Sequence, residues 1–106
     1  MEEIKFQLKF TPKASQDLDE IYNYISNNLY NETAAETLSE KIERSIMNLK
    51  DFPQLGTFVG DPELKERGYR KLIIENYIVF YLFNEIEGIV VIMRVLFGRQ
   101  EYQNFI

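Results

Sequence analysis

The 106-residue chain contains no cysteine, no histidine and no tryptophan. Without cysteine it has no disulfide, no thiolate nucleophile and no zinc site built on thiolates. Without histidine it has no Ser-His-Asp triad, no imidazole base and no metal bound through imidazole. Any acid–base chemistry therefore falls to Asp, Glu, Lys, Arg or Tyr side chains.

Long apolar runs are also missing. No segment reaches the roughly 20 apolar residues that span a membrane, and the first residues, Met1 to Glu3, are acidic, unlike a secretory leader. We therefore expect a cytoplasmic protein, and no metal or other cofactor. The remaining composition, 45% hydrophobic and 27% charged, suits a single globular domain over residues 1–106.

Acidic residues exceed basic ones, and the excess is confined to one part of the chain. The net charge is −5, which argues against a protein that mainly grips nucleic-acid phosphates. Residues 1–68 have 8 Lys/Arg and 13 Asp/Glu, whereas residues 69–106 have 4 of each. The basic residues of this neutral last third are Arg70, Lys71, Arg94 and Arg99.

Hydrophobic periodicity predicts one strand and two helices in the first half. Residues 4–10 alternate between apolar and polar side chains, as in a half-buried strand. Thr11 as N-cap and Pro12 at the first helical position then begin a helix over about residues 12–29. A capping box at 33–36 opens a second helix, which ends at Phe52-Pro53. The short connection between them predicts an antiparallel helical hairpin.

The second half is predicted to be a loop followed by three strands. Residues 53–68, rich in proline and glycine, are expected to form a surface loop. The β-branched and aromatic runs at 69–75, 77–84 and 89–97 have hairpin spacing. The order β-α-α-β-β-β predicts an α+β fold. It is a small, antiparallel-rich twisted sheet with the helical hairpin packed on one face, and the apolar last strand is expected to be central.

Arg94 is the least expected residue, because it interrupts the apolar run of this central strand. Either its stem packs on the sheet while its head reaches the rim, or it serves a site. Arg70, Arg99 and Tyr102 could join it near one end of the sheet, where a cluster of guanidinium groups suits a phosphate or a carboxylate. A charged, solvated end of the sheet explains the same residues.

Other conspicuous residues have simpler interpretations. Tyr77 and Tyr81 share a strand face and are expected to pack in the core. The acidic residues Asp17, Asp19 and Glu20 are interpreted as the solvated start of a helix, where carboxylates suit the helix dipole. An amphipathic helix with exposed aromatic residues such as Tyr24 can also receive a partner helix.

Several motifs in order resemble the RelE/ParE superfamily of toxins from bacterial type II toxin–antitoxin modules. They cover almost the whole chain: Ala14-x-x-Asp17-Leu18-x-x-Ile21-x-x-Tyr24-Ile25, Leu49-x-x-Phe52-Pro53-x-x-Gly56, Gly68-Tyr69-Arg70-Lys71-Leu72, Tyr77-Ile78-Val79-Phe80-Tyr81 and Val91 to Arg99. The resemblance implies a small toxin neutralised by a cognate antitoxin. The implied antitoxin-binding residues on the first helix are Leu18, Tyr22, Tyr24, Ile25 and Leu29.

The resemblance leaves the target open between two branches. ParE-like members block DNA gyrase, whereas RelE-like members cleave mRNA on the ribosome without metal. Ribonuclease members usually carry an Arg directly after the residue that matches Tyr77, where this chain has Ile78, and several end in a His-Tyr or basic tail. The sequence therefore favours the ParE-like branch.

Two alternatives remain beside this interpretation. In a ribonuclease, Arg70, Arg94 and Arg99 would hold the phosphate and Tyr102 would aid proton transfer. A non-toxic remnant would only bind its antitoxin.

Overall fold

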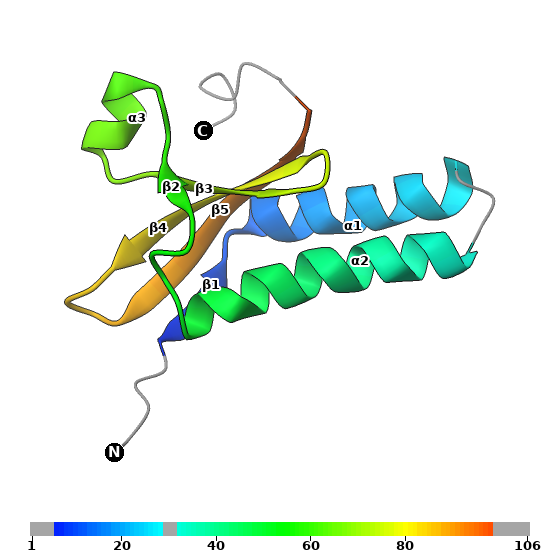
Figure 1. Cartoon of the computed structure of the whole chain (residues 1–106), viewed down its shortest axis with the longest axis horizontal. Helices are drawn as coiled ribbons and strands as arrows, with labels where there is room; N and C mark the ends of the chain where they lie inside the picture. Colours follow the sequence, from blue (N-terminus) through cyan, green and yellow to red (C-terminus); the bar gives the residue numbers. More distant parts are fainter. Residues whose placement is uncertain (1–5, 29–31, 99–106) are drawn as a thin grey trace.

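The computed structural model describes residues 6–28 and 32–98, and it has the predicted α+β architecture (Figure 1). None of the helices in these ranges is long and apolar enough to cross a membrane. The elements in chain order are β1 (Gln7–Phe10), α1 (Pro12–Asn28), α2 (Glu32–Met47), the 3-10 helix η1 (Asn48–Lys50), β2 (Thr57–Phe58), α3 (Pro62–Glu66), β3 (Arg70–Ile74), β4 (Tyr77–Asn84) and β5 (Ile89–Phe97).

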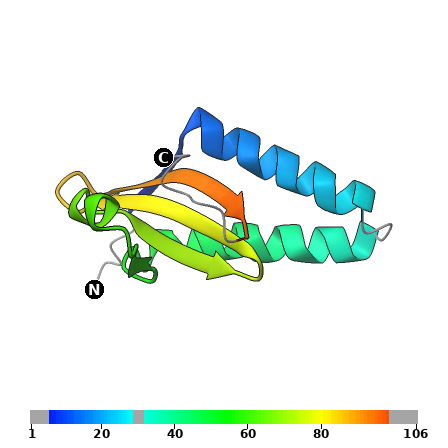
Figure 2. The same ribbon diagram turned by 90° about the horizontal axis from the view of Figure 1, so that it is seen from above.

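The five strands form one sheet in the order β1-β5-β4-β3-β2. The first strand pairs in parallel with the last, and the other three pairings are antiparallel. The expected inner position of β5 is confirmed, since it lies between β1 and β4. Helices α1 and α2 lie side by side along one face of the sheet, and their connected ends project beyond it (Figures 1 and 2).

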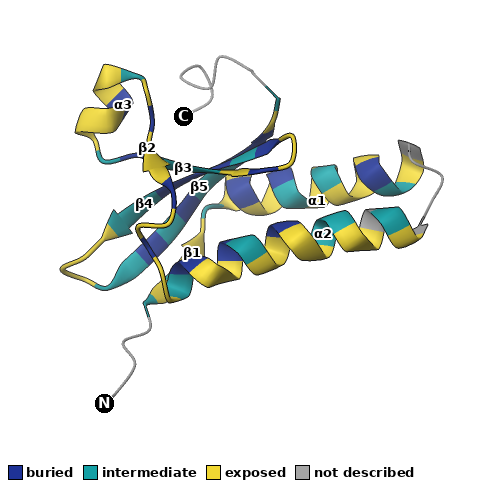
Figure 3. Cartoon of the chain, in the orientation of Figure 1, coloured by how far each residue is buried: buried dark blue, intermediate teal, exposed yellow. Residues whose placement is uncertain are grey.

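Both faces of the sheet are covered by apolar residues (Figure 3). The larger cluster joins α1, α2 and η1 to the inner strands, and it includes Tyr77 and Tyr81, as predicted. A smaller cluster lies on the opposite face, where α3 and the segments beside it cover β4 and β5. Its buried members are Val59, Leu64, Tyr69, Phe80 and Leu96.

A β-bulge interrupts β5 beside Arg94. Arg94 pairs with Phe80 of β4, but the next residue of β4, Tyr81, pairs with Ile92, so β5 carries one extra residue. The bulge explains why Ile92 and Val95, three positions apart, both contribute to the cluster beneath the helices. Bulges commonly redirect a side chain beside a functional site.

The start of α1 is tied to β5. The predicted N-cap is confirmed, because the Thr11 hydroxyl accepts a hydrogen bond from the Ala14 N–H at 3.0 Å. The same hydroxyl donates to the carbonyl of Met93 at 2.9 Å, and the Thr11 N–H donates to the carbonyl of Ile92. The expected cap of the second helix differs, since α2 begins at Glu32, one residue before Thr33.

The segment 53–68 is more ordered than predicted. It contains β2, which extends the sheet beside β3, and the short helix α3. Asp61 caps this helix by accepting from the Leu64 N–H at 3.0 Å, and Pro62 follows at the first helical position. Both elements are too short to show a hydrophobic period in the sequence, so the proline and glycine residues around them indicated a loop.

Tyr81 holds this segment against the sheet. Its buried hydroxyl donates to the carbonyl of Pro53 at 2.8 Å and accepts from the Gly56 N–H at 2.9 Å. Burial raises the pKa of Tyr81, so the phenol stays protonated and keeps its donor. A Cβ at Gly56 would lie 2.5 Å from the carbonyl oxygen of Lys71, and only glycine avoids this contact.

We expect Tyr81→Phe to lower the free energy of unfolding by about 1–3 kcal/mol, because it leaves a buried carbonyl and a buried N–H without their partner. Urea unfolding followed by circular dichroism measures the change. Tyr22→Phe, at an exposed position of α1, is the matched control and should stay within about 0.5 kcal/mol of the parent. Equal stability of the two variants would contradict the assignment.

Candidate functional site

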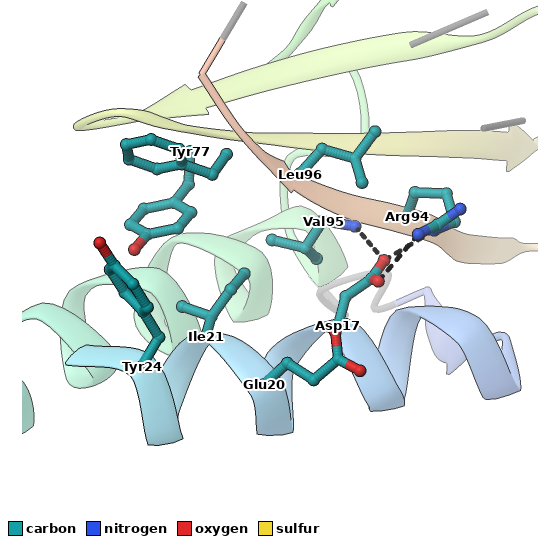
Figure 4. Close-up of a pocket in the computed structure, with 9 residues that line it drawn as sticks. Asp17, Glu20, Ile21, Tyr24, Tyr77, Arg94, Val95 and Leu96 are labelled. Carbon is teal, nitrogen blue, oxygen red and sulfur yellow. Dashed lines mark hydrogen bonds and ion pairs between the residues drawn. The ribbon is translucent and has the colours of Figure 1, made fainter. Parts of the chain in front are cut away.

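A pocket of about 320 Å³ lies between α1 and the end of β5 (Figure 4). Helix α1 contributes Asp17, Glu20, Ile21 and Tyr24, which follow one another at helical spacing of three and four along one side. The opposite wall comes from the strands, and its residues are Tyr77, Arg94, Val95, Leu96 and Phe97. One end of the pocket is therefore charged and the other is aromatic.

The charged end is built on a partly buried ion pair. Arg94 donates from Nε to Oδ2 of Asp17 at 2.7 Å and from Nη2 to Oδ1 at 2.9 Å. The Val95 N–H also donates to Asp17 Oδ2, at 3.0 Å. The hydrogen bond to Asp17 is the main cause that raises the pKa of Arg94 above its ordinary value, so the guanidinium remains charged.

Asp17 is the functional residue that the sequence interpretation missed. The sequence places it with Asp19 and Glu20 at a solvated helix start, but it is only 8% exposed in the structure. Its position carried the missing signal, because Asp17 follows Ala14 by three residues and precedes Ile21 by four. These spacings place it on the apolar stripe of α1, where a buried carboxylate needs a cation.

The aromatic end joins α1 to β4 and β5. The rings of Tyr77 and Phe97 pack with centroids 5.3 Å apart, and the hydroxyls of Tyr24 and Tyr77 point toward one another (Figure 4). Burial raises the pKa of Tyr77, and the neighbouring Tyr24 adds to the shift. The Tyr77 phenol is therefore a neutral group that donates or accepts hydrogen bonds at neutral pH.

The predicted arginine cluster is only partly represented in the described structure. Arg94 lines the pocket, but Arg70 does not. The Arg70 guanidinium donates to the carbonyl of Gly56 at 2.8 Å and stacks over the ring of Phe58 at 4.1 Å. Arg99 and Tyr102, the other two candidate catalytic residues, lie outside the described residues.

The residues that the sequence predicts to bind an antitoxin differ in how exposed they are. Tyr22 and Tyr24 are 46% and 61% exposed. Ile25 is only 2% exposed and Leu18 packs against the same core, so Ile25 cannot contact a partner in this conformation. Leu29 lies outside the described residues. The prediction of antitoxin binding on α1 therefore rests on Tyr22 and Tyr24.

A metal site is not indicated by the described side chains, since no three Asp or Glu residues among them are grouped to hold an ion. The two carboxylates of the pocket are also differently engaged. Asp17 accepts hydrogen bonds from Arg94 and Val95, and Glu20 accepts a hydrogen bond from the Gln16 amide at 3.1 Å.

Comparison with known proteins assigns the family. The profile of the family described as "ParE toxin of type II toxin-antitoxin system, parDE" matches residues 8–102, which is most of the chain. This chain belongs to the ParE toxin family. The predicted resemblance to the RelE/ParE superfamily, with the ParE-like branch favoured, is thereby confirmed, and the protein is a ParE-like toxin of the type II class.

Solved structures share the fold of this ParE-family chain. A chain of the chromosomal ParDE system from P. aeruginosa superposes with a TM-score of 0.71 at 22% identity, covering 90% of this chain and 98% of that one. A chain of the RelBE2 toxin–antitoxin complex from Mycobacterium tuberculosis gives 0.62 at 21% identity, covering 91% and 100%. The isolated RelE toxin of E. coli gives 0.59 at 14%, covering 94% and 93%. No curated protein sequence matches the chain.

We expect Asp17→Asn to lower the free energy of unfolding by about 3 kcal/mol, because the partly buried Arg94 loses its counter-charge and Val95 loses a charged acceptor. Denaturant unfolding of this variant and of Asp19→Asn, an exposed neighbour on α1, measures the difference. Asp19→Asn should change little.

Removal of both charges in Asp17→Asn/Arg94→Met should cost less than the sum of the two single substitutions, because no unpaired charge remains. Strict additivity would refute the pairing.

Proposed function

We propose that this protein arrests growth by inhibiting DNA gyrase through protein–protein contact, and that a cognate antitoxin neutralises it. Membership of the ParE family supports the toxin class. The main observation that supports gyrase as the target concerns Arg94. Its guanidinium donates two hydrogen bonds to Asp17. A ribonuclease needs such cations to stabilise the charge that develops on the phosphate in the transition state.

Two further observations support the same choice. Arg70 is engaged by Gly56 and Phe58, so its guanidinium serves the scaffold. Ile78 occupies the position at which ribonuclease members usually carry an Arg, and it packs against the smaller apolar cluster beside Phe80. The net charge of −5 further disfavours binding to mRNA within a ribosome.

The target is tested with the purified protein in two parallel reactions. We expect it to inhibit gyrase-catalysed DNA supercoiling and to leave mRNA intact on translating ribosomes. Tyr102→Phe should arrest growth as the parent does, because a gyrase inhibitor needs no proton transfer from this phenol. Cleavage of mRNA within codons, lost in Tyr102→Phe, would establish the ribonuclease alternative. Normal growth during soluble expression would instead establish the non-toxic remnant.

The antitoxin surface is proposed to include Tyr24 at the mouth of the pocket and Tyr22 on the side of α1 that faces α2. Large aromatic side chains that become buried in an interface commonly dominate its affinity. Tyr24 contributes to the pocket wall and is more than half exposed, so a docking segment would bury it between α1 and β5. The antitoxin itself is expected to be encoded beside this gene.

We expect Tyr24→Ala to weaken antitoxin binding at least about 10-fold, as measured by calorimetry with the protein encoded by the adjacent gene. The matched control is Ile86→Ala in the β4–β5 turn, where the side chain is almost fully exposed and lies outside the pocket. The control should bind as tightly as the parent. Equal losses in both variants, or no loss in Tyr24→Ala, would place the antitoxin elsewhere.

A further inference from the structure

The pocket between α1 and β5 is lined with aromatic rings at its mouth. Tyr24 and Phe97 are both more than half exposed, and they flank the buried Tyr77, whose ring packs against Phe97 at an angle of 60°. The side chains of Tyr24 and Tyr77 approach one another across the opening (Figure 4). Ring faces in this arrangement attract cations as well as apolar groups.

The pocket is lined by two carboxylates, Asp17 and Glu20, and one guanidinium, Arg94. Asp17 and Arg94 neutralise each other through their two hydrogen bonds. Glu20 is exposed at the rim, accepts a hydrogen bond from the uncharged amide of Gln16, and contributes to the raised pKa of Arg94. The charged residues that line the pocket therefore sum to −1.

The size of the pocket sets the kind of ligand. At about 320 Å³ it lies at the lower end of the range of 300–1,000 Å³ that is usual for ligand sites. This volume suits one long side chain rather than a helix face. A guanidinium group meets every requirement, because it is planar, stacks on aromatic rings and donates to a carboxylate.

We propose that the pocket receives an arginine side chain of the antitoxin, packed against the exposed ring of Tyr24 or Phe97 and hydrogen-bonded to Glu20. This inference rests on the proposed function for the existence of the antitoxin, and it adds the chemistry of the contact. The antitoxin segment is thus basic at this point. The acidic net charge of the whole chain, −5, favours the approach of such a segment.

The chemistry of the pocket is tested with three probes: Nα-acetyl-arginine methylamide, Nα-acetyl-norleucine methylamide and Nα-acetyl-glutamate methylamide. NMR titration of the 15N-labelled protein should show shifts at the amides of Glu20, Tyr24 and Phe97. We expect the arginine probe to bind at least about threefold more tightly than the norleucine probe, and the glutamate probe to bind most weakly. Norleucine binding as tight as arginine binding would overturn the proposal, as would shifts that avoid these amides.

Two variants test whether the carboxylate of Glu20 causes the preference for arginine. Glu20→Gln keeps the size of the rim residue and should remove the preference for arginine, whereas Glu43→Gln, an exposed residue of α2 outside this pocket, should retain it. An unchanged preference in Glu20→Gln would overturn the role of the carboxylate. Both substitutions are at exposed positions, so folding is expected to be unaffected.

Binding measurements with the antitoxin itself distinguish a failure of this proposal from a failure of the proposed function. Weaker binding of the antitoxin to Glu20→Gln than to Glu43→Gln, by about threefold, supports the arginine contact. Equal binding to both variants overturns that contact and leaves the proposed function standing. An antitoxin that does not bind the parent protein overturns the proposed function instead.

Discussion

The geometry of the pocket depends on one buried carboxylate. Strand β1 ends at Phe10, opposite Ile92, but β5 continues to Phe97, so among the described residues no strand pairs with the outer side of the last part of β5. Asp17 takes the place of that strand, since it accepts the Val95 N–H and both donors of Arg94. A backbone donor that would otherwise be buried without a partner is thereby satisfied. The same contacts fix α1 against the sheet, and Thr11 fixes its first turn in the same way.

Because the pocket geometry depends on Asp17, the residues that line the pocket also hold α1 against the sheet. Asp17, Ile21 and Tyr24 occupy one side of α1, so whatever holds Asp17 also sets the positions of Ile21 and Tyr24 beside β5. On the strand, Arg94, Val95 and Phe97 are consecutive or nearly so after the bulge. The bulge shifts the register of β5 by one residue, and this shift brings Val95 beneath the helix while Arg94 reaches Asp17. A loss of the ion pair therefore alters the aromatic mouth as well as stability.

The sequence predicted local structure well because local structure is what periodicity encodes. Strands β4 and β5 were predicted with the bounds that the structure has, and the start of α1 followed from Thr11 and Pro12. Arg94 was recognised as unusual, yet its partner lies 77 residues earlier, and no local pattern connects them. The acidic neighbours of Asp17 favoured a surface position, although its spacing from the apolar residues of α1 indicated the core face. The bulge and the parallel pairing of β1 are tertiary features without a sequence period.

The motifs that carry the family resemblance serve the scaffold more than the target. Pro53, Gly56 and Tyr81 form one hydrogen-bonded unit that holds the segment before β3, and Arg70 reinforces it through the Gly56 carbonyl. These contacts are required for the fold whichever target the protein has. The target therefore depends on how the remaining charges are used. Within the described part of the chain, the two arginines that a nuclease would need both serve internal contacts, whereas the aromatic mouth and Glu20 face outward. Such a distribution favours recognition of another protein over chemistry on a phosphate.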